Sequence, residues 1–349
     1  MIESVVNLKQ ADSVLGEKAE TGVELMNLKS VIEEIHQKLQ QDDIEVIILQ
    51  SRQFEAGTRC TPFYHDLSEK KCKTIVNVDS SARKEFEKGF PADGINGDGF
   101  VIRFTHEKYS NIPIINKYVG RNHVRIIMLG ETAYLSSFDF AEPSFNRDEL
   151  FMKITQPEIV QMLKIVSFWD YSKEKKSWNQ KAGDLELVFD TGKSSAGVLS
   201  RYADQKLHEN LNASSNLWVV SSWCPDELND TVNFASSRGS NINLLVNRQY
   251  EWESLKKIPF NITKILSNNE FRSSTKNSIL KIFNPTGKQI HAKFILTENQ
   301  GKYWWFVGTS NHTKFGSKAL TTEIGISGED QSIGDQLINY IESTEKVEV

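Results

Sequence analysis

Two motifs of similar composition lie in the two halves of the 349-residue chain. The second half carries Ile290-His291-Ala292-Lys293, then Gly308-Thr309-Ser310-Asn311, then Glu323. The first half holds a weaker copy: His123-Val124-Arg125, then Ser136-Ser137-Phe138-Asp139, then Glu149. A duplicated motif constrains the fold because it predicts two similar units whose half-sites join into one site.

The elements around the two motifs repeat in the same order. In the first half, a helical pattern over 31–39 precedes the apolar runs 44–49, 74–78, 99–104, 124–129 and 133–135. In the second half, a helical pattern over 198–211 precedes the runs 217–220, 243–247, 278–283, 292–296 and 304–307. Short β-branched runs of this kind predict buried strands, and the helical stretches predict helices on the sheet faces.

This order predicts an α/β fold of two lobes with pseudo-twofold symmetry, each a mixed β-sheet flanked by helices. We place the first half at residues 1–175 and the second at 176–349. The boundary falls within 171–190, because Tyr171 to Ser177 is polar and charged and is typical of a linker.

Composition limits the classes of protein to which the chain can belong. Hydrophobic residues make up 39% and charged residues 25%, which is typical of a globular protein. The net charge of −5 argues against a general binder of polyanions, so contact with nucleic acid requires a local basic surface. Three widely spaced cysteines, no signal peptide and no long apolar run predict a cytoplasmic protein without a membrane span.

The residue types of the motif suit a phosphodiester. Histidine can act as a nucleophile or an acid near neutral pH, lysine supplies a fixed positive charge, and a carboxylate can orient the imidazole. No other histidine has ligand-like spacing to cysteine, aspartate or another histidine, so we expect neither a metal nor another cofactor.

These residues resemble the signature of the phospholipase D superfamily, His-x-Lys-x4-Asp with a later Gly-Ser-x-Asn. In the second half His291, Lys293, Gly308, Thr309 and Asn311 match, and Glu298 stands at the aspartate position. In the first half His123 matches, whereas the other positions differ: Arg125, Gly130, Ser136, Ser137 and Asp139. The segment from Trp305 to Asn311 resembles the tyrosyl-DNA phosphodiesterase branch of that superfamily.

The resemblance implies a metal-independent phosphodiesterase that acts through a phosphohistidine. One histidine attacks phosphorus and the other protonates the leaving oxygen; we favour His123 as nucleophile and His291 as acid. Lys293 and Arg125 would hold the phosphate oxygens. Glu149 and Glu323, one after each histidine, are the candidates that orient the rings.

Further residues are candidates for contact with substrate. The resemblance places Thr309, Ser310, Asn311, Ser137 and Asp139 beside the phosphate, although a carboxylate at Asp139 would repel it. Trp223 follows the end of an expected strand and is a candidate for a further substrate contact.

Three functions remain open. The first is a nuclease or an enzyme that processes DNA ends, a monomer or homodimer that binds nucleic acid largely independently of sequence, with specificity supplied by a partner protein. The second is a phospholipase or phosphatidyl transferase, which requires an apolar docking surface. The third is a phosphate-binding protein without turnover, a reading motivated by Arg125 and Asp139.

Overall fold

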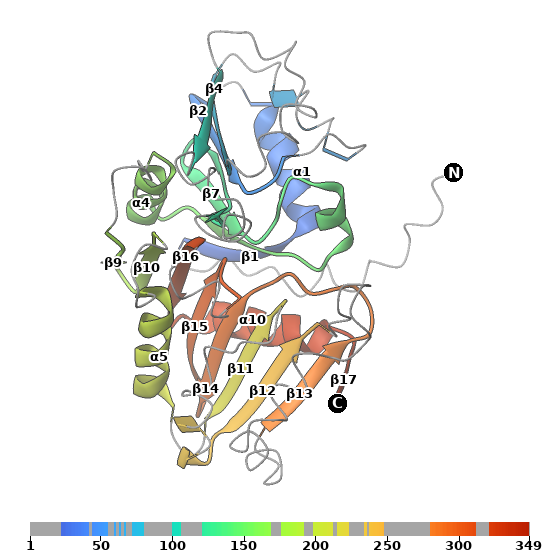
Figure 1. Cartoon of the computed structure of the whole chain (residues 1–349), viewed down its shortest axis with the longest axis vertical. Helices are drawn as coiled ribbons and strands as arrows, with labels where there is room; N and C mark the ends of the chain where they lie inside the picture. Colours follow the sequence, from blue (N-terminus) through green and yellow to red (C-terminus); the bar gives the residue numbers. More distant parts are fainter. Residues whose placement is uncertain are drawn as a thin grey trace, which may run out of the picture.

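The computed structural model describes residues 22–41, 44–54, 59–60, 63, 66–67, 72–79, 100–105, 121–168, 176–191, 198–211, 215–222, 234–235, 237–247, 280–311 and 321–348. Two sheets organise these residues, one in each lobe (Figure 1). The first sheet has seven strands in the order β1-β8-β7-β6-β2-β3-β4. Their bounds are β1 Val23–Asn27, β2 Val46–Ser51, β3 Lys73–Asp79, β4 Phe100–Thr105, β6 Ile126–Leu129, β7 Thr132–Ser136 and β8 Leu150–Ile154.

The second sheet has ten strands, nine of them in the order β17-β13-β12-β11-β14-β15-β16-β10-β9. The tenth, β5 (Arg121–Asn122), comes from the first half of the chain and pairs with β16. The other bounds are β9 Trp178–Ala182, β10 Leu185–Asp190, β11 Asn216–Ser221, β12 Asn241–Val246, β13 Leu280–Pro285, β14 Phe294–Asn299, β15 Lys302–Gly308, β16 Thr321–Gly328 and β17 Lys346–Glu348.

The two sheets share one topology, so the predicted pseudo-symmetric α/β fold is confirmed. β2 runs parallel to β3 and antiparallel to β6, and β11 relates in the same way to β12 and β14. β1 pairs with β8 as β10 pairs with β16, both antiparallel. Each apolar run predicted around the motifs overlaps one of these strands.

Helices form three layers around the two sheets. α1 (Leu28–Leu39) covers the outer face of the first sheet, and α5 (Val198–Asn210) covers that of the second. α4 (Pro157–Ser167) and α10 (Gln331–Ser343) each contact both sheets, and their apolar side chains belong to one core shared by the lobes. A short 3-10 helix, η5 (Glu142–Asn146), precedes β8.

Local sequence explains where the helices begin and which face they bury. The Asn27 side chain accepts a hydrogen bond from the Ser30 N–H at 2.9 Å and caps α1, whose buried residues recur every fourth position: Val31, Ile35 and Leu39. α4 begins at Pro157, whose missing N–H costs nothing at a first helical position.

Of the stretch in which we place the boundary, residues 171–175 lie outside the described residues. Residues 178–190 form a hairpin, β9 and β10, that turns at Gly183 with φ of 57°. β10 is buried at every position, so this part of the stretch belongs to the second sheet. The division into halves at residue 175 stays a prediction.

Candidate active site

Each motif histidine is held by backbone hydrogen bonds to a segment from the opposite half of the chain. β5 runs parallel to the start of β16, and the His123 N–H donates to the Thr322 carbonyl at 2.9 Å. Equivalently, Asp148 pairs with Ile290, and the His291 N–H donates to the Asp148 carbonyl at 2.8 Å. The two histidines therefore lie at the junction of the lobes.

The carboxylate partners are exchanged between the halves. The Nδ1 atom of His123 lies 2.9 Å from Oε1 of Glu323, and that of His291 lies 2.6 Å from Oε1 of Glu149. The sequence order paired each glutamate with the histidine before it, and this expectation is wrong. Glu323 directly follows Thr322, which pairs with Asn122, so its side chain reaches the histidine of the other half.

Glu323 is held as a carboxylate. Besides the His123 ring, the hydroxyl of Thr309 donates to it at 2.5 Å and that of Thr321 at 2.8 Å. Burial alone would raise its pKa, but the charge of His123 and these hydrogen bonds lower the pKa below its usual value. An acceptor saturated in this way fixes the Nδ1 proton on His123.

Glu149 lies in a different environment. Its Oε2 atom is buried and has no hydrogen-bond partner among the described residues. Burial raises the pKa of Glu149 to about 8 and lowers that of His291 well below 6.5, where Lys293 lowers it further. The pair therefore favours a neutral imidazole hydrogen-bonded to a protonated carboxyl group near pH 7, which leaves the proton of the ring on Nε2.

The basic residues occupy equivalent positions. Lys293 donates from Nζ to the His291 carbonyl at 2.8 Å, and Arg125 donates from Nη1 to the His123 carbonyl at 2.9 Å. Burial and the nearby Arg125 lower the pKa of Lys293 to about 7. Lys293 therefore carries only part of its charge near neutral pH until an anion binds.

Asp139 does not face a substrate phosphate as the sequence suggested. Its two oxygens accept from Nε and Nη2 of Arg125 at 2.9 and 3.0 Å, and Ser51 donates to Oδ1 at 3.0 Å. Burial would raise its pKa, but the charge of Arg125 dominates and lowers it to about 2. The carboxylate neutralises the arginine, so the first half-site offers a phosphate little net charge.

Among the described residues, the second half-site has no such ion pair. The Ser221 hydroxyl donates to the backbone carbonyl of Asn311 at 3.1 Å and lies 3.4 Å from the side-chain Oδ1 of Asn311. Asn311 carries an amide where the first half-site has the carboxylate of Asp139, so its Nδ2 atom can donate hydrogen bonds to an anion.

The other predicted contacts fall into three groups. The hydroxyl of Thr309 donates its hydrogen bond to Glu323, so it stabilises this carboxylate and does not contact a substrate. Ser137 and Ser310 are buried, with 2% and 1% of their surface exposed. Trp223 lies outside the described residues. Within the described part of the chain, no group of three or more His, Cys, Asp or Glu residues could hold a metal ion.

Several contributing residues escaped the sequence analysis. Asp79 accepts from the Asn122 N–H at 2.5 Å, and Asn247 accepts from the Ile290 N–H at 2.7 Å, so each stabilises the backbone before a histidine. Ser51 and Ser221 end equivalent strands, and an alignment of the two halves would have revealed them. Two half-buried arginines also act electrostatically on the site: Arg52 and Arg147.

The chain is similar to known proteins in sequence over part of its length and in fold over nearly all of it. The family model described as "Cardiolipin synthase, PLD-like domain" matches residues 207–344. The phosphatidylserine synthase of Haemophilus influenzae Rd KW20 has a similar structure, with a TM-score of 0.68 and 13% identity over 98% of this chain and 91% of that chain. No curated protein matches the chain in sequence.

A polyphosphate kinase from Porphyromonas gingivalis is also similar in structure. The TM-score is 0.61 with 13% identity, and the match covers 92% of this chain but 50% of the kinase chain. Residues 207–344 are thus similar to a PLD-like domain, and the two solved structures show that nearly the whole chain shares their fold. Among the described residues, no helix is long and apolar enough to cross a membrane.

Proposed function

We propose that the chain is a metal-independent phosphodiesterase that acts through a phosphohistidine on His123. The observation that carries this proposal is the difference between the two crossed pairs. Glu323 is a hydrogen-bonded carboxylate, whereas Glu149 is a buried carboxyl group with a raised pKa. One imidazole is thereby set as a base and the other as an acid, as two-step phosphoryl transfer requires.

The first step uses the free Nε2 atom of His123. With its Nδ1 proton bonded to Glu323, the ring has a lone pair on Nε2, an atom without a hydrogen-bond partner among the described residues. Nε2 bonds to phosphorus, the bond from phosphorus to the leaving oxygen breaks, and His291 gives that oxygen its Nε2 proton while Glu149 passes its own proton to Nδ1 of His291. In the second step Nε2 of His291 takes a proton from water, the Nδ1 proton returns to Glu149, the water oxygen bonds to phosphorus, and His123 is released.

Positive charge stabilises the phosphoryl group during both steps. Lys293 forms no ion pair with a carboxylate of the described residues, and binding of an anion would raise its pKa from about 7 and complete its charge. The amide of Asn311 supplies neutral donors on the same side. The transferred phosphoryl group is thus expected to lie against the second half-site.

For the substrate we propose nucleic acid, bound through its backbone and largely independently of sequence, with a partner protein supplying specificity. Arg52 and Arg147 support this class, because they add two positive charges, Arg52 near Arg125 and Arg147 near His291. A phosphodiester chain presents further phosphates to such cations at regular spacing. For this substrate the reaction is that of a nuclease or of a DNA-end phosphodiesterase.

Cleavage of single-stranded and supercoiled DNA in EDTA tests the proposal. The wild type is expected to cleave, His291→Ala to lose at least a hundredfold in rate, and His208→Ala, an exposed histidine on α5, to retain full rate. Cleavage that needs a divalent ion, or that survives His291→Ala, would contradict the mechanism.

A phospholipid headgroup is the second candidate substrate. The family description and the similar phosphatidylserine synthase favour it, since both names refer to phospholipid synthesis. Against it, the large exposed hydrophobic side chains of the described residues are few: Ile165, Phe168 and Val347. Turnover of phosphatidyl lipids in vesicles, without cleavage of DNA, would move the assignment to this class. No turnover of either substrate by a folded protein would favour a phosphate-binding role.

A further inference from the structure

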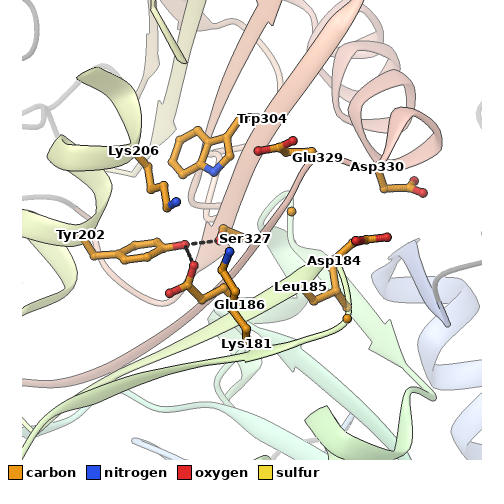
Figure 2. A pocket seen from close by; sticks show the side chains of 12 residues that line it. Lys181, Asp184, Leu185, Glu186, Tyr202, Lys206, Trp304, Ser327, Glu329 and Asp330 are labelled. Carbon is orange, nitrogen blue, oxygen red and sulfur yellow. Dashed lines mark hydrogen bonds between the residues drawn. The ribbon is translucent and has the colours of Figure 1, made fainter. Parts of the chain in front are cut away.

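An open cavity lies at the opposite end of the second sheet from the histidines. It has a volume of about 400 Å³ and is lined by the β9–β10 hairpin, α5 and the end of β16 (Figure 2). On β16, Ser327 at this cavity lies about 13 Å beyond Glu323, at roughly 3.3 Å per residue. Its size is that of a pocket for a small molecule, and none of the proposed catalytic residues lines it.

The floor of this cavity is a chain of buried polar groups. Tyr202 donates to Oε2 of Glu186 at 2.8 Å, and its hydroxyl lies 2.6 Å from that of Ser327 (Figure 2). Asn179 donates to the other carboxylate oxygen at 2.5 Å. These side chains are at most 9% exposed: Glu186, Tyr202 and Ser327.

The direction of these hydrogen bonds determines what the floor offers a ligand. A hydroxyl has one proton, and Tyr202 uses its proton on Glu186, so Ser327 must donate its own proton to Tyr202. Burial raises the pKa of Tyr202, which keeps that proton in place. The floor therefore has no hydroxyl proton left and presents only acceptor lone pairs, which suit a ligand with N–H donors.

The charges of the wall favour a cation. Four carboxylates line the cavity, namely Asp184, Glu186, Glu329 and Asp330, against two ammonium groups, Lys181 and Lys206. Lys206 is paired outside the cavity with Glu209, at 3.1 Å. Trp304 also lines the cavity, with 3% of its surface exposed, and forms an apolar part of its wall. We propose that this cavity binds an alkylammonium group, supplied by a free aliphatic diamine or by a lysine side chain of a partner protein.

Calorimetric titration of the full chain at low ionic strength tests this proposal. Cadaverine and an acetylated, amidated Gly-Lys-Gly peptide are the two probes; pentanediol and glutarate are the neutral and anionic controls for the diamine. Binding by cadaverine assigns a free diamine, and binding by the peptide alone assigns a protein side chain. Binding by neither, or tighter binding of pentanediol or glutarate, overturns the proposal.

Variants of exposed residues in the cavity wall give a second test, in which binding is expected to weaken for some and to strengthen for another. Glu329→Gln and Asp184→Asn are each expected to weaken binding about 2- to 5-fold, as exposed ion pairs do. Lys181→Glu is expected to strengthen it, because it replaces a repulsive charge by an attractive one. Glu33→Gln, an exposed carboxylate on α1, should leave affinity unchanged. An unchanged affinity in all three wall variants would place the bound cation elsewhere.

Discussion

The carboxyl group of Glu149, which precedes β8 in the first half of the chain, lies 2.6 Å from the Nδ1 atom of His291 in the second half. The reciprocal pair, His123 with Glu323, crosses the junction in the other direction. Each proposed catalytic histidine thus depends on the opposite lobe for its orientation and its proton. The two pairs differ in protonation, so substitutions at the two glutamates should have different kinetic signatures.

Glu149→Gln should impair the acid and spare the nucleophile. We expect a loss of about 10²- to 10⁴-fold in kcat/KM for a substrate with an alkoxide leaving group. A p-nitrophenyl phosphodiester needs no protonation of its leaving group, so its first step should change little. Glu323→Gln misorients His123 and should slow both substrates. Measured kcat/KM values on the two substrates decide this, and an equal loss for Glu149→Gln on both would contradict the assignment.

A covalent intermediate should accumulate when the second step is blocked. His291→Ala lacks the base that activates water, while a p-nitrophenyl substrate still allows attack by His123. Mass spectrometry is expected to detect an acid-labile adduct on His123 in this variant and none in His123→Ala. An adduct that persists in His123→Ala would reverse the roles of the two histidines.

The alkaline limb of the rate profile follows from two shifted groups. The pKa of Glu149 is raised to about 8 and that of Lys293 is lowered to about 7. In the active form both groups are protonated. Lys293 and then Glu149 lose their protons as the pH rises through 7 to 8. Therefore kcat/KM should fall with pH in this range. The arginine of Lys293→Arg keeps its charge at every pH in this range, so the fall in kcat/KM should begin at a higher pH. A profile that stays flat to pH 9 would contradict these protonation states.

The sequence predicted the strands around the motifs because short β-branched runs are buried on both faces of a sheet. Val46 to Ser51 and Asn216 to Ser221 illustrate this, since their apolar runs are equivalent and end at equivalent serines. β10 was missed although Leu185 to Asp190 is buried throughout, because the nearby charged segment suggested a linker.

The exchange of glutamates could not be predicted from local sequence. Spacing gives the order of Glu149 and Glu323 along the chain, but their partners depend on how β5 pairs with β16 across the junction. The ion pair between Arg125 and Asp139 could not be predicted from local sequence either. Each of the two side chains by itself would act on a phosphate, and their mutual neutralisation depends on a contact that local sequence does not show.

Substitution of the Arg125–Asp139 pair by the residues of the second half provides a test of that neutralisation. Asp139→Asn leaves a buried arginine without its carboxylate and should lower the free energy of unfolding by about 3–5 kcal/mol. Arg125→Lys should also destabilise, because an ammonium cannot bind both oxygens of Asp139. The double variant recreates the arrangement of Lys293 and Asn311, so it should lose less than the sum of the single losses.

Urea unfolding of the four proteins measures this coupling. Glu131→Gln is the matched control: Glu131 is 80% exposed in its ion pair with Lys164, and its loss should cost under about 1 kcal/mol. Strictly additive losses would show that Arg125 and Asp139 do not stabilise each other. The first half-site would then offer the full charge of Arg125 to a phosphate, and the preference for the second half-site would lose its basis.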